Sequence, residues 1–233
     1  MDALSLDLIV AAAALAFTHT LLGPDHTLPF VMLARAQRWS TRRTLAVTLA
    51  CGIGHVGSSL LLGAAGLALG LGVAHVTRAE EVRGGLAAWA LVAFGAAYAL
   101  WGIRHALRRR HGLTPHEHHG HVHLHPGGGA SHQHEGAGES RSTFWALFIV
   151  FVLGPCEPLI PLFVLPASRG RFDAAVAAAV VFSLVTVATM LVLVGLAQAG
   201  VRRLPLAALE RWSHALAGAV IAASGLAVIF LGL

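Results

Sequence analysis

The 233-residue chain is 56% hydrophobic, contains only 12% charged residues and has a formal net charge of +5 at pH 7. Soluble domains carry roughly 25% charged residues, so this composition excludes an ordinary soluble domain. All 16 basic residues are arginines, and they stand in short groups between long apolar runs. Arginines in such positions are topology signals of a membrane protein, which excludes a nucleic-acid-binding surface as the reason for the positive charge.

Six apolar runs predict six transmembrane helices, because each is long enough to cross the hydrocarbon core of a bilayer. They lie at residues 4–33, 44–74, 84–103, 143–166, 174–200 and 212–233. The first and fourth runs are interrupted by Gly23-Pro24 and Gly154-Pro155, where we expect broken helices. Residues 1–22 have no basic leading segment, so we expect no cleaved signal peptide. The predicted fold class is all-α, a polytopic helical membrane protein.

The arginines predict the orientation of the chain in the membrane. The loops after the first, third and fifth spans hold Arg35, Arg38, Arg42, Arg43, Arg104, Arg108, Arg109, Arg110, Arg141, Arg202, Arg203 and Arg211. The loops after the second and fourth spans hold only Arg78, Arg83, Arg169 and Arg171. Because arginine-rich loops stay in the cytoplasm, we expect an inner-membrane protein with both termini outside and residues 104–142 in the cytoplasm.

A short motif occurs once in each half of the chain. Leu22-Gly23-Pro24-Asp25-His26 in the first span matches Leu153-Gly154-Pro155-Cys156-Glu157 in the fourth, and each motif opens a group of three spans. An odd number of spans gives the two groups opposite orientations, which is a common transporter design with its site at the helix breaks. We therefore predict two inverted three-helix repeats, residues 1–103 and 143–233. The alternative is that Gly-Pro recurs by chance in an apolar chain.

The segment between the repeats, residues 104–142, is rich in histidine. It contains His116, His118, His119, His121, His123, His125, His132 and His134. Alternating histidines share one face of an extended chain. Tracts of this kind bind borderline divalent metals loosely, at several exchangeable places. The alternative is a solvated polar linker, and the run Gly127-Gly128-Gly129 argues for disorder.

The first helix break carries the strongest candidate for a functional site. His19, Asp25 and His26 lie close together in an apolar span, and ionisable groups inside a membrane usually mark a pathway or a binding site. Imidazole and carboxylate groups suit Ni²⁺, Co²⁺, Zn²⁺ or Fe²⁺. The alternatives are a proton relay, or a kink whose freed backbone groups are satisfied by these side chains.

Three further residues extend this candidate site. His55 lies in the second span among small residues that let a neighbouring helix approach closely, so it could reach the first break. Cys156 and Glu157 follow the second break and could add a thiolate and a carboxylate from the other repeat. For His55 the alternative is a hydrogen bond to a helix backbone, and for Cys156 an inert buried thiol.

These motifs resemble those of a known family. The segment from His19 to His26 is similar to the signature of the nickel/cobalt transporter family, with one extra residue between His19 and Asp25, and closer still to the transmembrane protein associated with urease maturation. Gly54-His55-Val56-Gly57-Ser58 resembles the histidine motif in the next span of those families. Gly154-Pro155-Cys156-Glu157-Pro158 resembles the Pro-Cys segment of the nickel/cobalt efflux permease, which also has a His-rich cytoplasmic loop.

The resemblance implies an integral membrane transporter for Ni²⁺ or Co²⁺, with Zn²⁺ or Fe²⁺ as further candidates, no permanent cofactor and no enzymatic activity. The ligands implied are His19, Asp25, His26, His55, Glu157 and Cys156. The partners implied are the lipid bilayer and cytoplasmic metallochaperones or urease or hydrogenase maturation proteins, and no nucleic acid.

Two other functions stay open within the wider superfamily. The transmembrane thiol-disulfide reductases need a redox cysteine in each half, whereas here Asp25 stands where Cys156 stands in the second half. A sulfite-type anion exporter would use the positive ends of half-helices that begin at Pro24 and Pro155. Asp25 and Glu157 would convert those ends into a pair of carboxylates suited to a cation.

Overall fold

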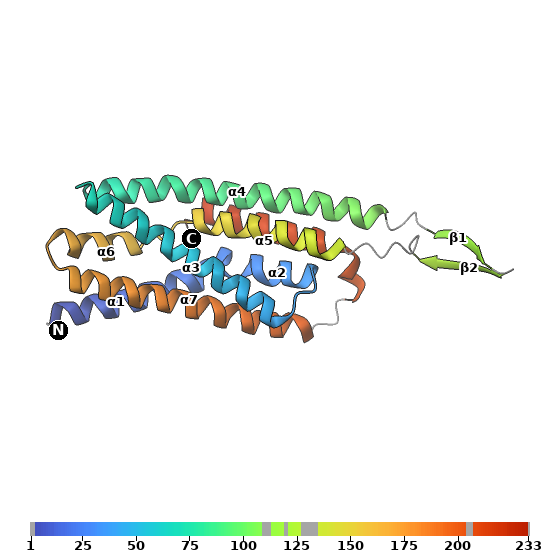
Figure 1. Ribbon diagram of the computed structural model, residues 1–233, viewed down its shortest axis with the longest axis horizontal. Coiled ribbons are helices and arrows are strands. Elements are labelled where there is room, and N and C mark those ends of the chain that lie inside the picture. Colours follow the sequence, from blue (N-terminus) through green and yellow to red (C-terminus); the bar gives the residue numbers. More distant parts are fainter. Residues whose placement is uncertain (1–2, 109–112, 119–120, 127–134, 204–206, 233) are drawn as a thin grey trace.

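The computed structural model describes residues 3–108, 113–118, 121–126, 135–203 and 207–232. The chain forms a helical bundle elongated along one axis, with a two-stranded hairpin beyond one end (Figure 1). The elements in chain order are α1 (Ala3–Leu22), η1 (Pro24–His26), α2 (Leu28–Ala36), α3 (Thr41–Ala68), α4 (Val73–Arg108), β1 (Leu113–His118), β2 (His121–Pro126), α5 (Glu135–Leu153), α6 (Leu159–Ser168), α7 (Phe172–Arg203), η2 (Ala207–Trp212) and α8 (Ser213–Leu231). The predicted helical fold is confirmed.

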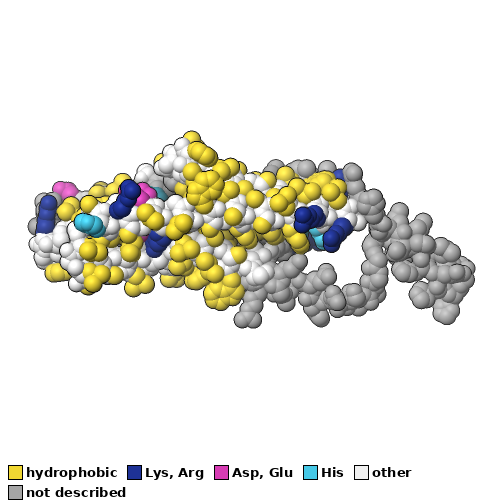
Figure 2. All heavy atoms as spheres, turned by 90° about the horizontal axis from the view of Figure 1, so that it is seen from above, with side chains coloured by type: hydrophobic (Ala, Val, Ile, Leu, Met, Phe, Trp, Pro, Cys, Tyr) yellow, Lys and Arg dark blue, Asp and Glu magenta, His cyan; other side chains and the backbone are white. Residues whose placement is uncertain are grey.

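Among the described residues, five helices are long and apolar enough to cross a bilayer: Ser5–Leu22, Thr41–Ala68, Val73–Arg108, Phe172–Arg202 and Glu210–Leu231. Their outer faces expose large hydrophobic side chains, for example Leu61, Leu196 and Phe230. Hydrophobic side chains are spread along the whole visible flank of the bundle (Figure 2). An apolar flank of this extent requires lipid rather than water around it. The chain is therefore a multi-pass integral membrane protein.

The predicted break in the fourth span is present, and the start of the third span differs from the prediction. The fourth span consists of two shorter helices, α5 and α6, because the backbone leaves the helical conformation at Gly154-Pro155. The third predicted span begins much earlier, since α4 starts at Val73. Glu80 and Arg83 therefore lie within a helix rather than in a loop.

The first break has a clear local cause. α1 ends at Leu22, and Pro24, which has no backbone N–H, starts the single turn of η1 before α2 begins. A Cβ atom on Gly23 would lie 2.3 Å from His26 Nδ1 and 2.8 Å from Asp25 Oδ1. Only glycine leaves space for both side chains to fold back over the break. The Gly23-Pro24 motif thus places Asp25 and His26 inside the bundle.

α4 and α8 are in backbone contact through glycines. A Cβ atom on Gly95 would lie 2.3 Å from the backbone nitrogen of Ala222, and one on Gly218 would lie 2.2 Å from that of Ala99. We call this contact the glycine seam. The broken helices pack elsewhere, since α1 lies along α7 and α5 lies along α3.

Polar contacts define the two ends of the bundle. Near the hairpin end, Arg35 Nη1 donates to the carbonyl of Val201 at 3.0 Å, and Arg202 Nη2 donates to that of Trp39 at 3.0 Å. The loops after the first and fifth predicted spans therefore meet. The N-terminus of α1 lies at the opposite end (Figure 1), where Arg171 Nη2 donates to Ser5 Oγ at 2.9 Å.

The hairpin falls in the His-rich segment. β1 and β2 pair antiparallel, with His116 opposite His123 and His118 opposite His121. The extended conformation expected for the alternating histidines is therefore present, although the segment was not expected to form a hairpin. His119, His132, His134 and the run of glycines lie outside the described residues.

Candidate functional site

Three histidines from separate elements converge at the first helix break. His19 comes from the last turn of α1, His26 from η1 and His55 from the middle of α3. One ligand nitrogen from each lies within 4.8 Å of the other two. The ring centroids of His19 and His26 are 4.9 Å apart, and those of His26 and His55 are 5.2 Å apart. The predicted convergence of His55 with the first break is thus present, and we call these three residues the histidine triad.

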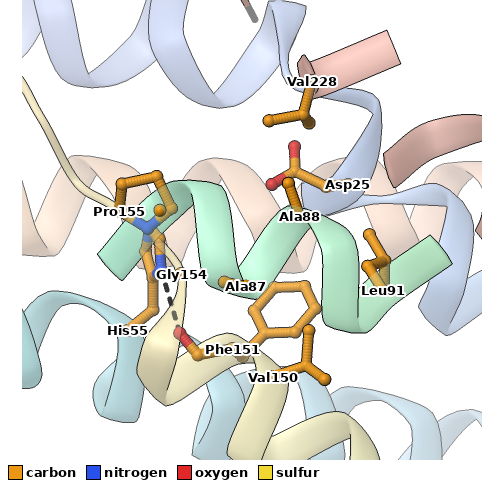
Figure 3. A pocket seen from close by; sticks show the side chains of 11 residues that line it. Asp25, His55, Ala87, Ala88, Leu91, Val150, Phe151, Gly154, Pro155 and Val228 are labelled. Atoms are coloured by element: carbon orange, nitrogen blue, oxygen red, sulfur yellow. Dashed lines mark hydrogen bonds between the residues drawn. The ribbon is translucent and has the colours of Figure 1, made fainter. Parts of the chain in front are cut away.

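Two rings of the triad, those of His26 and His55, are buried beside charged or polar groups, whereas His19 is half-buried. His26 and His55 are each only 2% exposed. His55 Nδ1 lies 3.2 Å from the carbonyl oxygen of Phe151 on α5, so this nitrogen is the donor (Figure 3). His26 Nδ1 lies 3.0 Å from Asp25 Oδ1, an ion-pair contact. A neutral imidazole that carries its proton on Nδ1 presents a lone pair on Nε2. The Nε2 atoms of all three histidines are buried without a hydrogen-bond partner.

A pocket lies between His55, one member of the triad, and the second break. It encloses about 360 Å³, including its open mouth, and its lining contains Asp25, His55 and Pro155. Small residues of α4, Gly84, Ala87 and Ala88, form one wall. In Figure 3 the carboxylate of Asp25 lies beside Ala88 and Val228, while His55 and Pro155 lie on the other side of Ala87. The two breaks therefore face a shared space between α4, α5 and α8.

The second break is fixed by a buried ion pair on α4. Glu80 is 0% exposed, and its Oε1 accepts from the backbone N–H of Cys156 at 2.9 Å and from Arg83 Nη2 at 2.7 Å. The same Arg83 nitrogen also lies 3.2 Å from the carbonyl oxygen of Gly154. Ser59 on α3 donates a further hydrogen bond to Glu80 Oε1. This ion pair therefore satisfies backbone groups that the broken helix leaves without intrahelical partners.

Sequence reasoning missed Glu80 and Arg83. Both were placed before the third span, and Arg83 was counted as an arginine of an external loop; that assignment is wrong, because Arg83 is largely buried in α4. The sequence does contain a signal for this buried pair. An acid and an arginine three residues apart share one helix face, and this pair directly precedes a long apolar run.

The remaining predicted ligands lie outside the triad. Asp25 contacts His26, and Cys156 is fully buried at the second break, whereas Glu157 is exposed. Within the described residues, the group of mutually close ligand atoms contains the triad alone. The side chains of the His-rich segment are not among the described ones, so loose metal binding there stays a prediction, as do the metallochaperone partners.

The two cysteines are free thiols and pack in different parts of the core. Cys51 belongs to a buried hydrophobic cluster with Leu147 and Phe151, whereas Cys156 belongs to another cluster with Val56 and Leu159. The two thiols are therefore in separate parts of the core, and no disulfide joins them.

Comparison with known proteins gives one match. Residues 24–233 match the family model described as "Cytochrome C biogenesis protein transmembrane region". No curated protein and no solved structure matches the chain. This match overturns the assignment to the nickel/cobalt transporters, and with it the transport of Ni²⁺ or Co²⁺. The match agrees with the wider superfamily, which includes the thiol-disulfide reductases. A short signature of histidine, aspartate and a Gly-Pro break was too little to separate these families. Since the matched segment covers most of the sequence, the chain belongs to the family of cytochrome c biogenesis protein transmembrane regions.

Proposed function

We propose that this protein transfers electrons through the membrane by thiol-disulfide exchange, with Cys156 as the exchanging thiol. The observation that carries the proposal is the position of Cys156. In a chain of a cytochrome c biogenesis family, it is the cysteine that stands at a helix break, directly after Gly154-Pro155. A break inside a bundle is where irregular backbone borders a cavity, so a reactive group there can be reached when the pocket opens.

An inverted repeat is part of this proposal. Residues 1–103 and 143–233 would form the two repeats and residues 104–142 their connection, with α5 and α6 together making the fourth of six spans. The packing supports this repeat. The contact of α1 with α7 corresponds to the contact of α5 with α3, and the contact of α2 with α8 corresponds to the contact of α6 with α4. Each contact thus has a counterpart with the repeats exchanged. The orientation follows from the arginines, with both termini outside and the His-rich segment in the cytoplasm.

The exchange needs only one thiol from this chain. The Cys156 thiolate attacks a disulfide of an acceptor protein, the acceptor's S–S bond breaks, and a mixed disulfide forms while one acceptor sulfur leaves as a thiolate and takes a proton. A thiolate of a donor dithiol protein then attacks the Cys156 sulfur, which releases the acceptor with both thiols reduced. The donor's second thiolate attacks its own bridged sulfur and frees Cys156. Two electrons pass from donor to acceptor, and the donor ends as a disulfide.

The single-thiol scheme agrees with the separation of the cysteines. Cys51 and Cys156 belong to different hydrophobic clusters, and Asp25 occupies the position in the first repeat that corresponds to Cys156. Glu80 and Arg83 hold the backbone around Cys156. Because Cys156 is fully buried, exchange requires the α5–α6 segment to move away from α4.

The experiment compares Cys156→Ala with Cys51→Ala, two buried thiols that form a matched pair. Cells producing each variant are quenched with acid, and mixed disulfides are resolved on non-reducing gels. Haem staining reports the level of c-type cytochromes. We expect Cys156→Ala to lose both the mixed disulfides and the haem signal, and Cys51→Ala to keep both. Retention of both signals in Cys156→Ala would refute the proposal, and a Cys51–Cys156 disulfide that forms on oxidation would replace it with an internal dithiol scheme.

A further inference from the structure

The histidine triad brings together three buried nitrogens that have no hydrogen-bond partner. His19, His26 and His55 come from three separate elements, and the Nε2 atom of each is buried without a hydrogen-bond partner. A buried polar atom without a partner destabilises the folded state, so native proteins rarely keep several of them together without a ligand. The thiol chemistry of Cys156 uses none of these atoms. The triad therefore calls for a ligand that accepts three nitrogen lone pairs at once.

The surroundings of the rings are those of metal-binding histidines. Such histidines usually donate the N–H of their second ring nitrogen to a carboxylate or a backbone carbonyl, which fixes the tautomer and leaves the other nitrogen free for the metal. His55 has the carbonyl oxygen of Phe151 at 3.2 Å in this role. His26 Nδ1 lies 3.0 Å from Asp25 Oδ1, which is an ion-pair contact without hydrogen-bond geometry. Asp25 thus supplies charge beside His26, instead of being a direct ligand.

The distances suit one ion. Metal–nitrogen bonds of about 2.0 Å place three nitrogens about 3.5 Å apart around a trigonal centre. The ligand atoms of the triad lie within 4.8 Å of one another, so closure needs ring movements of about 1 Å. Gly23 provides the space for the His26 ring, because a Cβ there would lie 2.3 Å from its Nδ1.

The charge of the site selects the kind of ion. Three neutral imidazoles contribute no charge, and the Asp25 carboxylate contributes one negative charge. The neighbouring Glu80 and Arg83 pair with each other. A monovalent ion would make the site neutral, whereas a divalent ion would leave one net positive charge inside the bilayer, where uncompensated charge is costly. Among the transition metals that imidazole binds, copper has a monovalent state in proteins.

We infer that the histidine triad binds a single Cu⁺ ion through the Nε2 atoms of His19, His26 and His55, with Asp25 as the charge-balancing group. This site is separate from the thiol exchange at Cys156, and either can fail without the other.

The test uses the full-length protein in detergent, with the eight candidate histidines of the His-rich segment replaced by asparagine so that loose binding does not mask the site. Cu⁺ is titrated anaerobically against a chromogenic Cu⁺ chelator of known affinity. We expect one Cu⁺ per chain, and three nitrogen neighbours in X-ray absorption of the bound copper. His55→Ala should remove the tight site, and the exposed His75→Ala is its matched control. Asp25→Asn, which keeps the side-chain shape, should weaken binding 10- to 100-fold at unchanged stoichiometry.

The possible outcomes separate the parts of the inference. Binding of one Zn²⁺ more tightly than Cu⁺ would overturn the assignment of a monovalent ion. Failure to bind either ion, or equal binding by the parent protein and His55→Ala, would overturn the metal site and leave the triad as a hydrated imidazole cluster. Cys156→Ala should titrate like the parent, which keeps this test independent of the thiol proposal. Gel filtration of each variant separates lost binding from lost folding.

Discussion

Replacement of Glu80 by alanine should strongly destabilise the protein, although Glu80 lies outside both the triad and the exchanging thiol. Its Oε1 atom accepts hydrogen bonds from Arg83 Nη2 at 2.7 Å and from the Cys156 backbone at 2.9 Å. Glu80→Ala leaves the Arg83 guanidinium, which is 17% exposed, without its counter-ion. Removal of one partner of a buried pair costs about 3–5 kcal/mol.

The chain offers a control on the same helix. Arg78 and Glu81 are also an acid–arginine pair on α4, but their side chains are 80% and 49% exposed and 3.6 Å apart. Exposed pairs of this kind contribute about 0–1 kcal/mol, so Glu81→Ala should have little effect. A double replacement, Glu80→Leu with Arg83→Met, removes both charges and should recover most of the loss seen in Glu80→Ala.

The free energy of unfolding can be measured in mixed micelles with increasing denaturing detergent, followed by tryptophan fluorescence. The reasoning would be refuted if Glu80→Ala cost no more than Glu81→Ala. It would also be refuted if the double variant were as unstable as Glu80→Ala, because the loss would then not come from an unpaired charge.

Three further substitutions, the first with a matched control, test other parts of the protein. Gly95→Ala should destabilise the bundle by about 1–3 kcal/mol, because its Cβ would overlap the backbone of Ala222; Gly57→Ala, with nothing within 4 Å of its Cβ, should be neutral or stabilising in the same denaturation assay. Gly23→Ala should lower the affinity for Cu⁺ in the chelator titration, since its Cβ displaces the His26 ring, and an unchanged affinity would contradict the role given to the break. Ala130→Cys should resist a membrane-impermeant maleimide in intact cells and react after lysis, because the His-rich segment is expected in the cytoplasm; labelling of intact cells would reverse the orientation.

The sequence was most informative where a local rule acts. Gly-Pro interrupts a helix whatever surrounds it, so both breaks were predicted at the correct residues. The convergence of His55 with His19 and His26 was also predicted, because small residues beside a buried histidine indicate a close helix contact. The length of an apolar run was a weaker guide to where a helix begins and ends. α4 continues through Glu80 and Arg83 because each neutralises the other, and hydropathy alone cannot show such a pairing.

Other features depend on contacts between distant segments. The carbonyl that orients His55 belongs to Phe151, far along the chain, and the backbone nitrogen that Glu80 binds belongs to Cys156. No local pattern reveals these contacts. The family was also misjudged from local motifs, because the residues around the first break resemble a metal-transport signature, whereas the match to the cytochrome c biogenesis family extends over residues 24–233.

The glycine seam has a mechanical consequence for the pocket. Helices whose backbones touch at Gly95 and Gly218 cannot slide past each other without a steric clash, so α4 and α8 behave as one rigid unit. The wall of the pocket that contains Ala87, Ala88 and Val228 belongs to this rigid unit. The opposite wall, from Val150 to Pro155, lies at the second helix break. The polar contacts of Glu80 and Arg83 join this break to α4. The α5–α6 side can therefore move away from α4 and α8 only when those polar contacts break.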